Sequence, residues 1–154
     1  MYKKAMILMV VLMLLLVSMT AASAMPKDAE RIDCVIDITY DPEIGAYWQG
    51  PVTGCALAGT IRFVESPDNY SADGKEYFFE DFTIWPDSGG VIYGKDAGVW
   101  DFATFKFHAK GEVTDASGKW ADLVGYKFVE MGRTSDPEVL PLRGPNTAMT
   151  LYTH

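Results

Sequence analysis

The chain has 154 residues, and its 21 acidic residues outnumber its 13 basic ones to give a formal net charge of −8. This is the length of one domain with a buried core. Because an acidic surface repels phosphate groups, the charge argues against nucleic acid and anionic lipid surfaces as partners, and we interpret the acidity as a source of solubility.

The first 24 residues have the three parts of a secretory signal peptide. Lys3 and Lys4 form a basic start, an apolar run extends to about Val17, and Ala22-Ser23-Ala24 is a small-residue cleavage site. We therefore predict cleavage near Ala24, a mature domain of residues 25–154, a secreted or periplasmic location and no stable membrane insertion after cleavage. An uncleaved anchor is the alternative, although the run is shorter than the ~20 residues that span a bilayer.

Cys34 and Cys55 are the two cysteines of the chain. In an exported protein, such a pair predicts a disulfide bond, here a cross-strand or strand-to-loop link. Two free thiols that serve catalysis or metal binding are the alternative.

Alternating apolar and polar residues predict a series of strands separated by short turns. The first strand is expected at residues 32–40, with Ile32, Cys34, Ile36 and Ile38 on one face. A short, edge-like strand is expected at residues 47–52, where Pro51 lacks a ladder donor. Further strands are expected at residues 55–65, 76–85, 91–93 and 147–152, with a polar loop at 66–74, a turn at 94–98 and a proline-rich segment at 140–145 that is unsuited to an interior strand.

Residues 99–131 carry the clearest hairpin pattern, with a turn at Asp115–Lys119 and a short helical turn at residues 120–125. The whole chain offers seven or eight strands with short turns and no long amphipathic helix. This pattern predicts an all-β fold, an antiparallel meander that closes as an up-and-down barrel of about eight strands. A barrel of this size can hold one small ligand.

The hairpin turn resembles a turn of the allene oxide cyclase and dirigent-like barrels, which belong to a calycin-like group. The resemblance covers about fifteen residues, from Gly111 to Gly125, and departs at residues 115–117, where that family often has Gly-Gly-Thr. Gly118, Lys119, Trp120 and Gly125 fall at matching spacing. The resemblance implies an eight-stranded barrel with an apolar interior. It carries over no catalytic residue, because the matched positions are structural.

Aromatic residues make up 13% of the chain. Aromatic walls bind apolar or aromatic ligands, although barrel cores also use aromatic side chains simply to fill space. We predict that the interior binds a small apolar or aromatic molecule, without a cofactor. The candidate ligand-binding residues are Trp85, Trp100, Trp120, Tyr77, His108 and Glu80.

Carboxylates are candidates for acid–base chemistry. Asp33 and Asp37 share one face of the first strand, whereas Glu80 and Asp81 must point to opposite faces of theirs. A carboxyl group inside an apolar barrel has a raised pKa and can act as a general acid or base. A solvated outer face is the alternative for these positions. The alternative functions are therefore a cyclase- or isomerase-like enzyme on the same barrel, and an envelope or interaction protein without a ligand.

The sequence predicts no metal site. Residues 69–80 loosely echo a calcium loop, but the segment begins with Asn69 rather than aspartate, and we interpret it as a solvated hairpin loop. His108 and His154 are the only histidines, and a zinc site would need carboxylate or thiolate ligands besides them. Asn69-Tyr70-Ser71 is also a glycosylation sequon.

Overall fold

A computed structural model describes residues 31–43 and 45–153, so the predicted signal peptide lies outside the described residues. The described part of the chain forms nine strands and one short 3-10 helix. In chain order these are β1 (Arg31–Tyr40), β2 (Tyr47–Thr53), β3 (Gly59–Glu65), β4 (Tyr70–Ala72), β5 (Lys75–Pro86), β6 (Ile92–Asp101), β7 (Lys106–Ala116), η1 (Gly118–Leu123), β8 (Lys127–Arg133) and β9 (Leu142–Tyr152).

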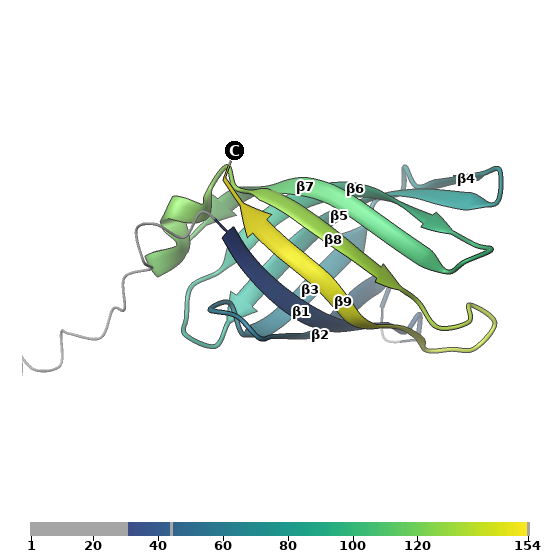
Figure 1. Ribbon diagram of the computed structural model, residues 1–154, viewed down its shortest axis with the longest axis horizontal. Coiled ribbons are helices and arrows are strands. Elements are labelled where there is room, and N and C mark those ends of the chain that lie inside the picture. Colours follow the sequence, from purple (N-terminus) through teal and green to yellow (C-terminus); the bar gives the residue numbers. More distant parts are fainter. Residues whose placement is uncertain (1–30, 44, 154) are drawn as a thin grey trace, which may run out of the picture.

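Eight of these strands form a closed antiparallel barrel. The strands neighbour one another in the order β3-β2-β1-β9-β8-β7-β6-β5, and β3 pairs with β5 to close the sheet. The ninth strand, β4, pairs only with the start of β5 and projects from one end of the barrel, while η1 lies at the other end (Figure 1). The predicted all-β, up-and-down barrel is therefore confirmed.

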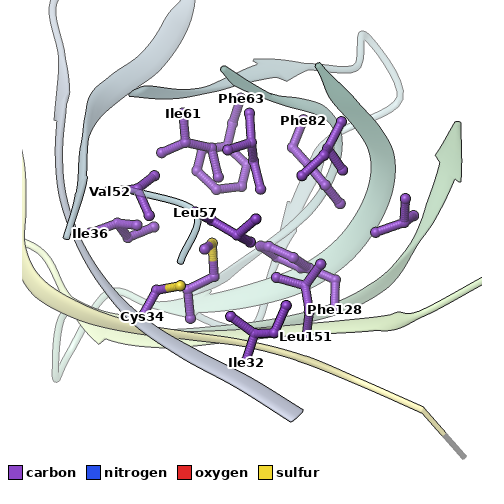
Figure 2. Close-up of a cluster of buried hydrophobic side chains, with 14 of the residues drawn as sticks. Ile32, Cys34, Ile36, Val52, Leu57, Ile61, Phe63, Phe82, Phe128 and Leu151 are labelled. Carbon is purple, nitrogen blue, oxygen red and sulfur yellow. The ribbon is translucent and has the colours of Figure 1, made fainter. Parts of the chain in front are cut away.

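Alternation along each strand sends every second side chain into the barrel. On β1 the predicted apolar face is buried throughout. Figure 2 shows apolar side chains from several strands pointing toward one another inside the barrel. The labelled residues are Ile32, Cys34, Ile36, Val52, Leu57, Ile61, Phe63, Phe82, Phe128 and Leu151. This apolar core fills the half of the barrel nearer η1.

The helix η1 closes that end of the barrel and confirms the predicted helical turn. Its Trp120 side chain is only 1% exposed and its Nε1 donates a hydrogen bond to the carbonyl oxygen of Gly89, at 2.9 Å. Gly118 and Gly125, on either side of the plug, have φ values of +65° and +88°, which favour glycine. The residues matched by the family resemblance are therefore those that build the barrel end.

The predicted turn at residues 94–98 is wrong, because β6 runs unbroken through it. Gly94 and Gly98 face the interior, opposite Phe82 and Phe78 on β5. A side chain at either glycine would collide with the facing phenylalanine ring. These glycines are therefore space for aromatic rings rather than turn residues, as in sheets where an aromatic side chain covers a cross-strand glycine.

Three other expectations also need correction. The strand β2 is not an edge, since it pairs with both β1 and β3. The strand β9 begins at Leu142, inside the proline-rich segment, and the expected loop at residues 66–74 contains β4.

Among the described residues, no helix combines the length and the hydropathy needed to cross a membrane.

The predicted disulfide is confirmed between Cys34 and Cys55, whose Cα atoms are 5.1 Å apart. Cys34 lies on β1 and points inward, whereas Cys55 lies in the loop between β2 and β3 rather than in the expected strand. The bond is thus a strand-to-loop link. It holds the loop that carries Leu57 into the apolar core, where the two sulfur atoms lie beside that residue (Figure 2).

Candidate binding cavity

A partly enclosed cavity of about 230 Å³ occupies the end of the barrel opposite η1. Its wall combines six aromatic residues with four glutamates, and no lysine, arginine or histidine lines it among the described residues. The lining residues are Ile38, Tyr40, Trp48, Phe63, Glu65, Glu76, Phe78, Glu80, Trp100, Phe107, Glu130, Thr134 and Leu142. The cavity is therefore both aromatic and acidic.

Two tryptophans bring indole N–H groups to the cavity. Trp48 packs against Tyr40 with ring centroids 5.4 Å apart, and its Nε1 donates a hydrogen bond to Glu65 Oε1 at 3.2 Å. Trp100 packs edge-on against Phe102, and its Nε1 is buried without a hydrogen-bond partner. A buried donor without a partner costs free energy, so an acceptor on a bound molecule would stabilise it.

Deeper in the barrel, acidic residues converge from three strands. Glu80 on β5 is the direct cross-strand partner of Asp96 on β6, and on its other side it pairs with Glu65 on β3. Glu130 reaches the same place from β8. One carboxylate oxygen from each of Glu80, Asp96 and Glu130 lies within 4.8 Å of the other two. We call these three residues the acidic triad.

The strand β7, which lies between β6 and β8, leaves space for the carboxylates of Asp96 and Glu130 to approach each other. The inward positions of β7 beside Asp96 and Glu130 are Gly111 and Ala109, respectively. A Cβ atom added to Gly111 would lie 2.6 Å from the Cβ of Asp96. The small residues on β7 therefore let the β6 and β8 carboxylates approach each other across the intervening strand.

An aromatic cluster forms a dry floor beneath the acidic triad. Phe63, Phe82 and Phe128 each lie one inward position further from the cavity mouth than Glu65, Glu80 and Glu130 on the same strands. The rings of Phe82 and Phe128 stack with centroids 4.3 Å apart, and Phe63 meets Phe128 edge-on at 6.1 Å. This floor is the part of the apolar core that lies next to the carboxylates.

Burial and neighbouring negative charges raise the pKa of all three carboxyl groups of the triad. Burial, followed by the neighbouring charges of Asp96 and Glu130, raises the pKa of Glu80 well above its usual range. Burial also raises the pKa of Asp96 to about 8, with a smaller contribution from Asp81. Burial and then Asp96 raise the pKa of Glu130 well above its usual range. Both effects disfavour the charged form of a carboxyl group.

Within the described part of the chain, no cationic side chain compensates the triad. The ion pairs there are Arg31–Asp33, Lys95–Asp81 and Lys127–Glu112, all of them outside the barrel. Both oxygens of Asp96 and Oε2 of Glu130 are buried without a hydrogen-bond partner, in side chains only 6% and 2% exposed. Such orphaned buried oxygens are rare in folded proteins and indicate a missing partner.

The structure separates the six candidate residues into three places. Trp100 and Glu80 line the cavity, and Trp120 plugs the opposite end. Trp85, Tyr77 and His108 lie on the outer surface. Trp85 is 38% exposed, with the guanidinium of Arg62 5.5 Å from its ring centre, and Tyr77 stacks on Tyr70 at 4.9 Å.

His108 faces outward because a tight turn changes the alternation. It was a candidate ligand-binding residue because it would share a face with Trp100 if one strand ran through both. Instead β6 ends at Asp101 and β7 starts at Lys106, and Phe105 in the connecting turn has a φ of +58°. Trp100 therefore pairs with Phe107, and His108 pairs with the outward-facing Val99.

The other acid–base candidates divide between the two faces of the barrel. Glu80 points inward, whereas Asp81 points outward to Lys95, at 3.6 Å. Asp33 accepts hydrogen bonds from Arg31 and Thr150, and Asp37 accepts one from the backbone N–H of Asn146. The segment that echoes a calcium loop turns at Asp73 and Gly74 in the β4–β5 hairpin, and Glu80 points away from it into the barrel.

Sequence reasoning missed Asp96 and Glu130. Asp96 fell within the wrongly predicted turn. Along β6, however, Ile92, Gly94, Asp96, Gly98 and Trp100 are every second residue and so lie on the same face of the strand. Glu130 follows the inward-facing Phe128 by two residues, and period-2 alternation alone places it inside. The signal was therefore present, but it could be used only with the correct strand boundaries.

Fold and site together define a class of protein. It is a closed, eight-stranded antiparallel barrel with an interior cavity that has an aromatic wall and carboxyl groups at its deep end. Comparisons with protein-family models, with curated proteins and with solved structures found no match for this chain.

Proposed function

We propose that this protein is an exported β-barrel that binds one small apolar or aromatic molecule in its cavity. The observation that carries the proposal is the combination of six aromatic residues around about 230 Å³ with an unpartnered indole N–H at Trp100. Ligand sites typically combine an apolar wall with a few polar groups. Because a cavity of ~150 Å³ holds benzene, this one suits a molecule of one or two rings.

Two further observations support parts of this proposal. The disulfide between Cys34 and Cys55 suits an oxidising compartment and thus an exported protein. The positive φ values of Gly118 and Gly125, together with the buried Trp120, agree with kinship to the allene oxide cyclase and dirigent-like barrels. We propose that kinship at the level of the barrel and its end plug.

A cyclase- or isomerase-like enzyme is the second candidate. The observation that favours it is that Glu80 and Glu130 line the cavity with strongly raised pKa values. A carboxyl group that keeps its proton near neutral pH can protonate a bound substrate. An interaction protein with a packed interior is disfavoured by the cavity.

The binding proposal is tested by following the indole N–H signals in ¹H–¹⁵N NMR spectra during titration with phenol, indole and 2-naphthol. The chain has four tryptophans, so each signal can be assigned by substitution. We expect the signals of Trp48 and Trp100 to move with saturation, while those of Trp85 and Trp120 stay in place. Saturable shifts confined to Trp85, or no saturable shift at all, would contradict the proposal.

Matched variants sharpen this test. Trp100→Phe removes the free N–H and part of the wall, and we expect it to weaken binding of 2-naphthol about tenfold. Trp85→Phe changes the same residue type on the outer surface and leaves the affinity unchanged. If a bound compound is also chemically rearranged, and Glu80→Gln abolishes the rearrangement but not the binding, the enzyme candidate replaces the simple binding protein.

A further inference from the structure

We propose that Glu80, Asp96 and Glu130 form a binding site for one hard divalent cation, such as Ca²⁺ or Mn²⁺, at the deep end of the cavity, above the aromatic floor. Glu80 and Glu130 also line the cavity proposed for small-molecule binding. The cation site rests on the carboxylates rather than on the aromatic wall, and it does not depend on that function.

The geometry of the acidic triad fits a single ion. Oxygen ligands lie about 2.0–2.6 Å from Mg²⁺ or Ca²⁺, so two oxygens on the same ion are separated by no more than about 5 Å. One oxygen from each triad member lies within 4.8 Å of the other two. The three carboxylates come from β5, β6 and β8, and the barrel itself fixes their spacing.

The unpartnered oxygens supply a second and separate observation. Both oxygens of Asp96 and one of Glu130 are buried without a donor. The further charged groups that act on the triad are themselves acidic: Glu65 and Glu76 act on Glu80, and Asp81 acts on Asp96. Lys95, next to Asp96 in sequence, points outward to Asp81. A bound cation would supply buried carboxylate oxygens of Asp96 and Glu130 with a partner, which no described side chain does.

The ligand set defines the class of cation. The triad offers only carboxylate oxygens, because His108 lies on the outer face and both cysteines are in the disulfide. Oxygen-only sites suit Ca²⁺, Mg²⁺ and Mn²⁺, whereas Zn²⁺ and copper favour nitrogen and sulfur ligands. Because Glu80 and Glu130 also line the cavity, the remaining coordination positions face it and are open to water or to an oxygen of a bound molecule.

The cavity also provides an entry route. Glu65 and Glu76 also line it and are half-buried, and burial raises the pKa of each carboxyl group. Acidic groups along a passage with low-dielectric walls concentrate cations in it. The aromatic floor formed by Phe63, Phe82 and Phe128 closes the passage below the triad, so an entering ion reaches the three carboxylates and stops there.

The experiment is calorimetric titration of the chelator-treated mature chain with CaCl₂, MnCl₂ and MgCl₂, with no organic molecule present. We expect one saturable site per chain for at least one of these ions. Binding releases protons, because ligating carboxylates must be ionised. Asp96→Asn and Glu130→Gln should each weaken the affinity at least tenfold. The matched control is Asp81→Asn, which removes the outward carboxylate next to Glu80. Because the charge of Asp81 contributes to the raised pKa of Asp96, its removal should not weaken the affinity.

A second measurement keeps the test independent of folding defects. Thermal unfolding by circular dichroism should show that the ion raises Tm in the wild-type chain and in Asp81→Asn, but not in a folded Asp96→Asn protein. Absence of saturable binding of all three ions at millimolar concentration would overturn the proposal. So would equal weakening by Asp81→Asn, or binding of phenethylammonium that is lost in Asp96→Asn while no metal ion binds. These outcomes leave the NMR titration with neutral aromatic compounds free to succeed or fail separately.

Discussion

Glu80 and Asp96 are cross-strand partners inside the barrel, and a phenylalanine–glycine pair lies on each side of them along the same two strands. Phe78 covers Gly98 toward the cavity mouth, and Phe82 covers Gly94 toward the core. The two aromatic rings restrict water on both sides of the carboxyl pair. This arrangement explains why burial is the largest cause of the raised pKa of both groups.

The first prediction concerns stability against pH in the presence of a chelator. The pKa of Asp96 is about 8 in the folded chain, against about 3.9 when unfolded. The contribution of protonated Asp96 to the free energy of unfolding is fully present at pH values below its unfolded pKa. It is lost as the pH rises through its folded pKa. The slope is about −1.4 kcal/mol per pH unit at most for each carboxyl that holds its proton. Urea unfolding at pH 5, 6.5 and 8 should therefore show the highest stability at pH 5.

The control for this prediction is Asp96→Asn, which resembles the protonated side chain and cannot ionise. We expect its stability to fall less steeply between pH 5 and pH 8 than that of the wild-type chain. The remaining slope reports Glu80 and Glu130, the other members of the acidic triad. A wild-type chain that becomes more stable from pH 5 to pH 8 would show that the triad is not protonated in the absence of metal.

The barrel was predictable from the sequence because its information is local. Alternation on β1 and on the hairpin of β7 and β8, with glycine and proline at turns, specifies strands whatever their partners. The acidic triad was harder to predict, because its assembly depends on the register between strands. Whether Gly94 and Gly98 make a turn or make room for rings depends on Phe82 and Phe78, which are more than ten residues away in sequence.

The candidate site was predicted only in part, for the same reason. Glu80 lies on a strand that was correctly placed, and it points inward there. Trp100 also points inward, although its strand β6 was predicted in two pieces with a turn at residues 94–98. His108 was included among the ligand-binding candidates because the turn at residues 102–105 could not be seen in a continuous alternating pattern. Trp120, by contrast, was expected as a ligand contact and as a structural position of the matched turn, and the structure places it at the plugged end.

The second prediction concerns the glycine that lets the triad assemble. Gly111→Ala would place a Cβ 2.6 Å from the Cβ of Asp96 and still closer to the carbonyl oxygen of Lys95, which is backbone and cannot turn away. We expect a loss of at least about 2 kcal/mol in the free energy of unfolding. Lys110→Ala, at the adjacent outward position, should change it by no more than about 0.5 kcal/mol. Equal and small effects of both variants in urea unfolding would contradict this packing.

The third prediction concerns the disulfide, which joins residues 21 apart in the sequence. In the chain-entropy description, closing a loop of this length stabilises the folded state by about 3 kcal/mol. Reduction with dithiothreitol should therefore lower the urea midpoint of the wild-type chain markedly. The double variant Cys34→Ala with Cys55→Ala should unfold at a similarly low midpoint and show no response to the reductant. A wild-type midpoint that is unaffected under reducing conditions, with both thiols titrated as free, would refute the prediction.

The fourth prediction concerns Trp120, which fills the barrel end opposite the cavity. Trp120→Phe removes the hydrogen bond to the Gly89 carbonyl and leaves a void in the buried barrel end. It also alters the contact with Lys119, whose Nζ lies 4.6 Å from the centre of the tryptophan ring in the wild-type chain. We expect a loss of about 2 kcal/mol in urea unfolding, whereas Trp85→Phe on the outer surface costs about 0.5 kcal/mol or less. Because the aromatic floor and the apolar core lie between Trp120 and the cavity, folded Trp120→Phe protein should bind 2-naphthol and Ca²⁺ or Mn²⁺ as the wild type does. If the variant keeps full stability but loses ligand affinity, then Trp120 serves the binding site rather than the closure of the barrel.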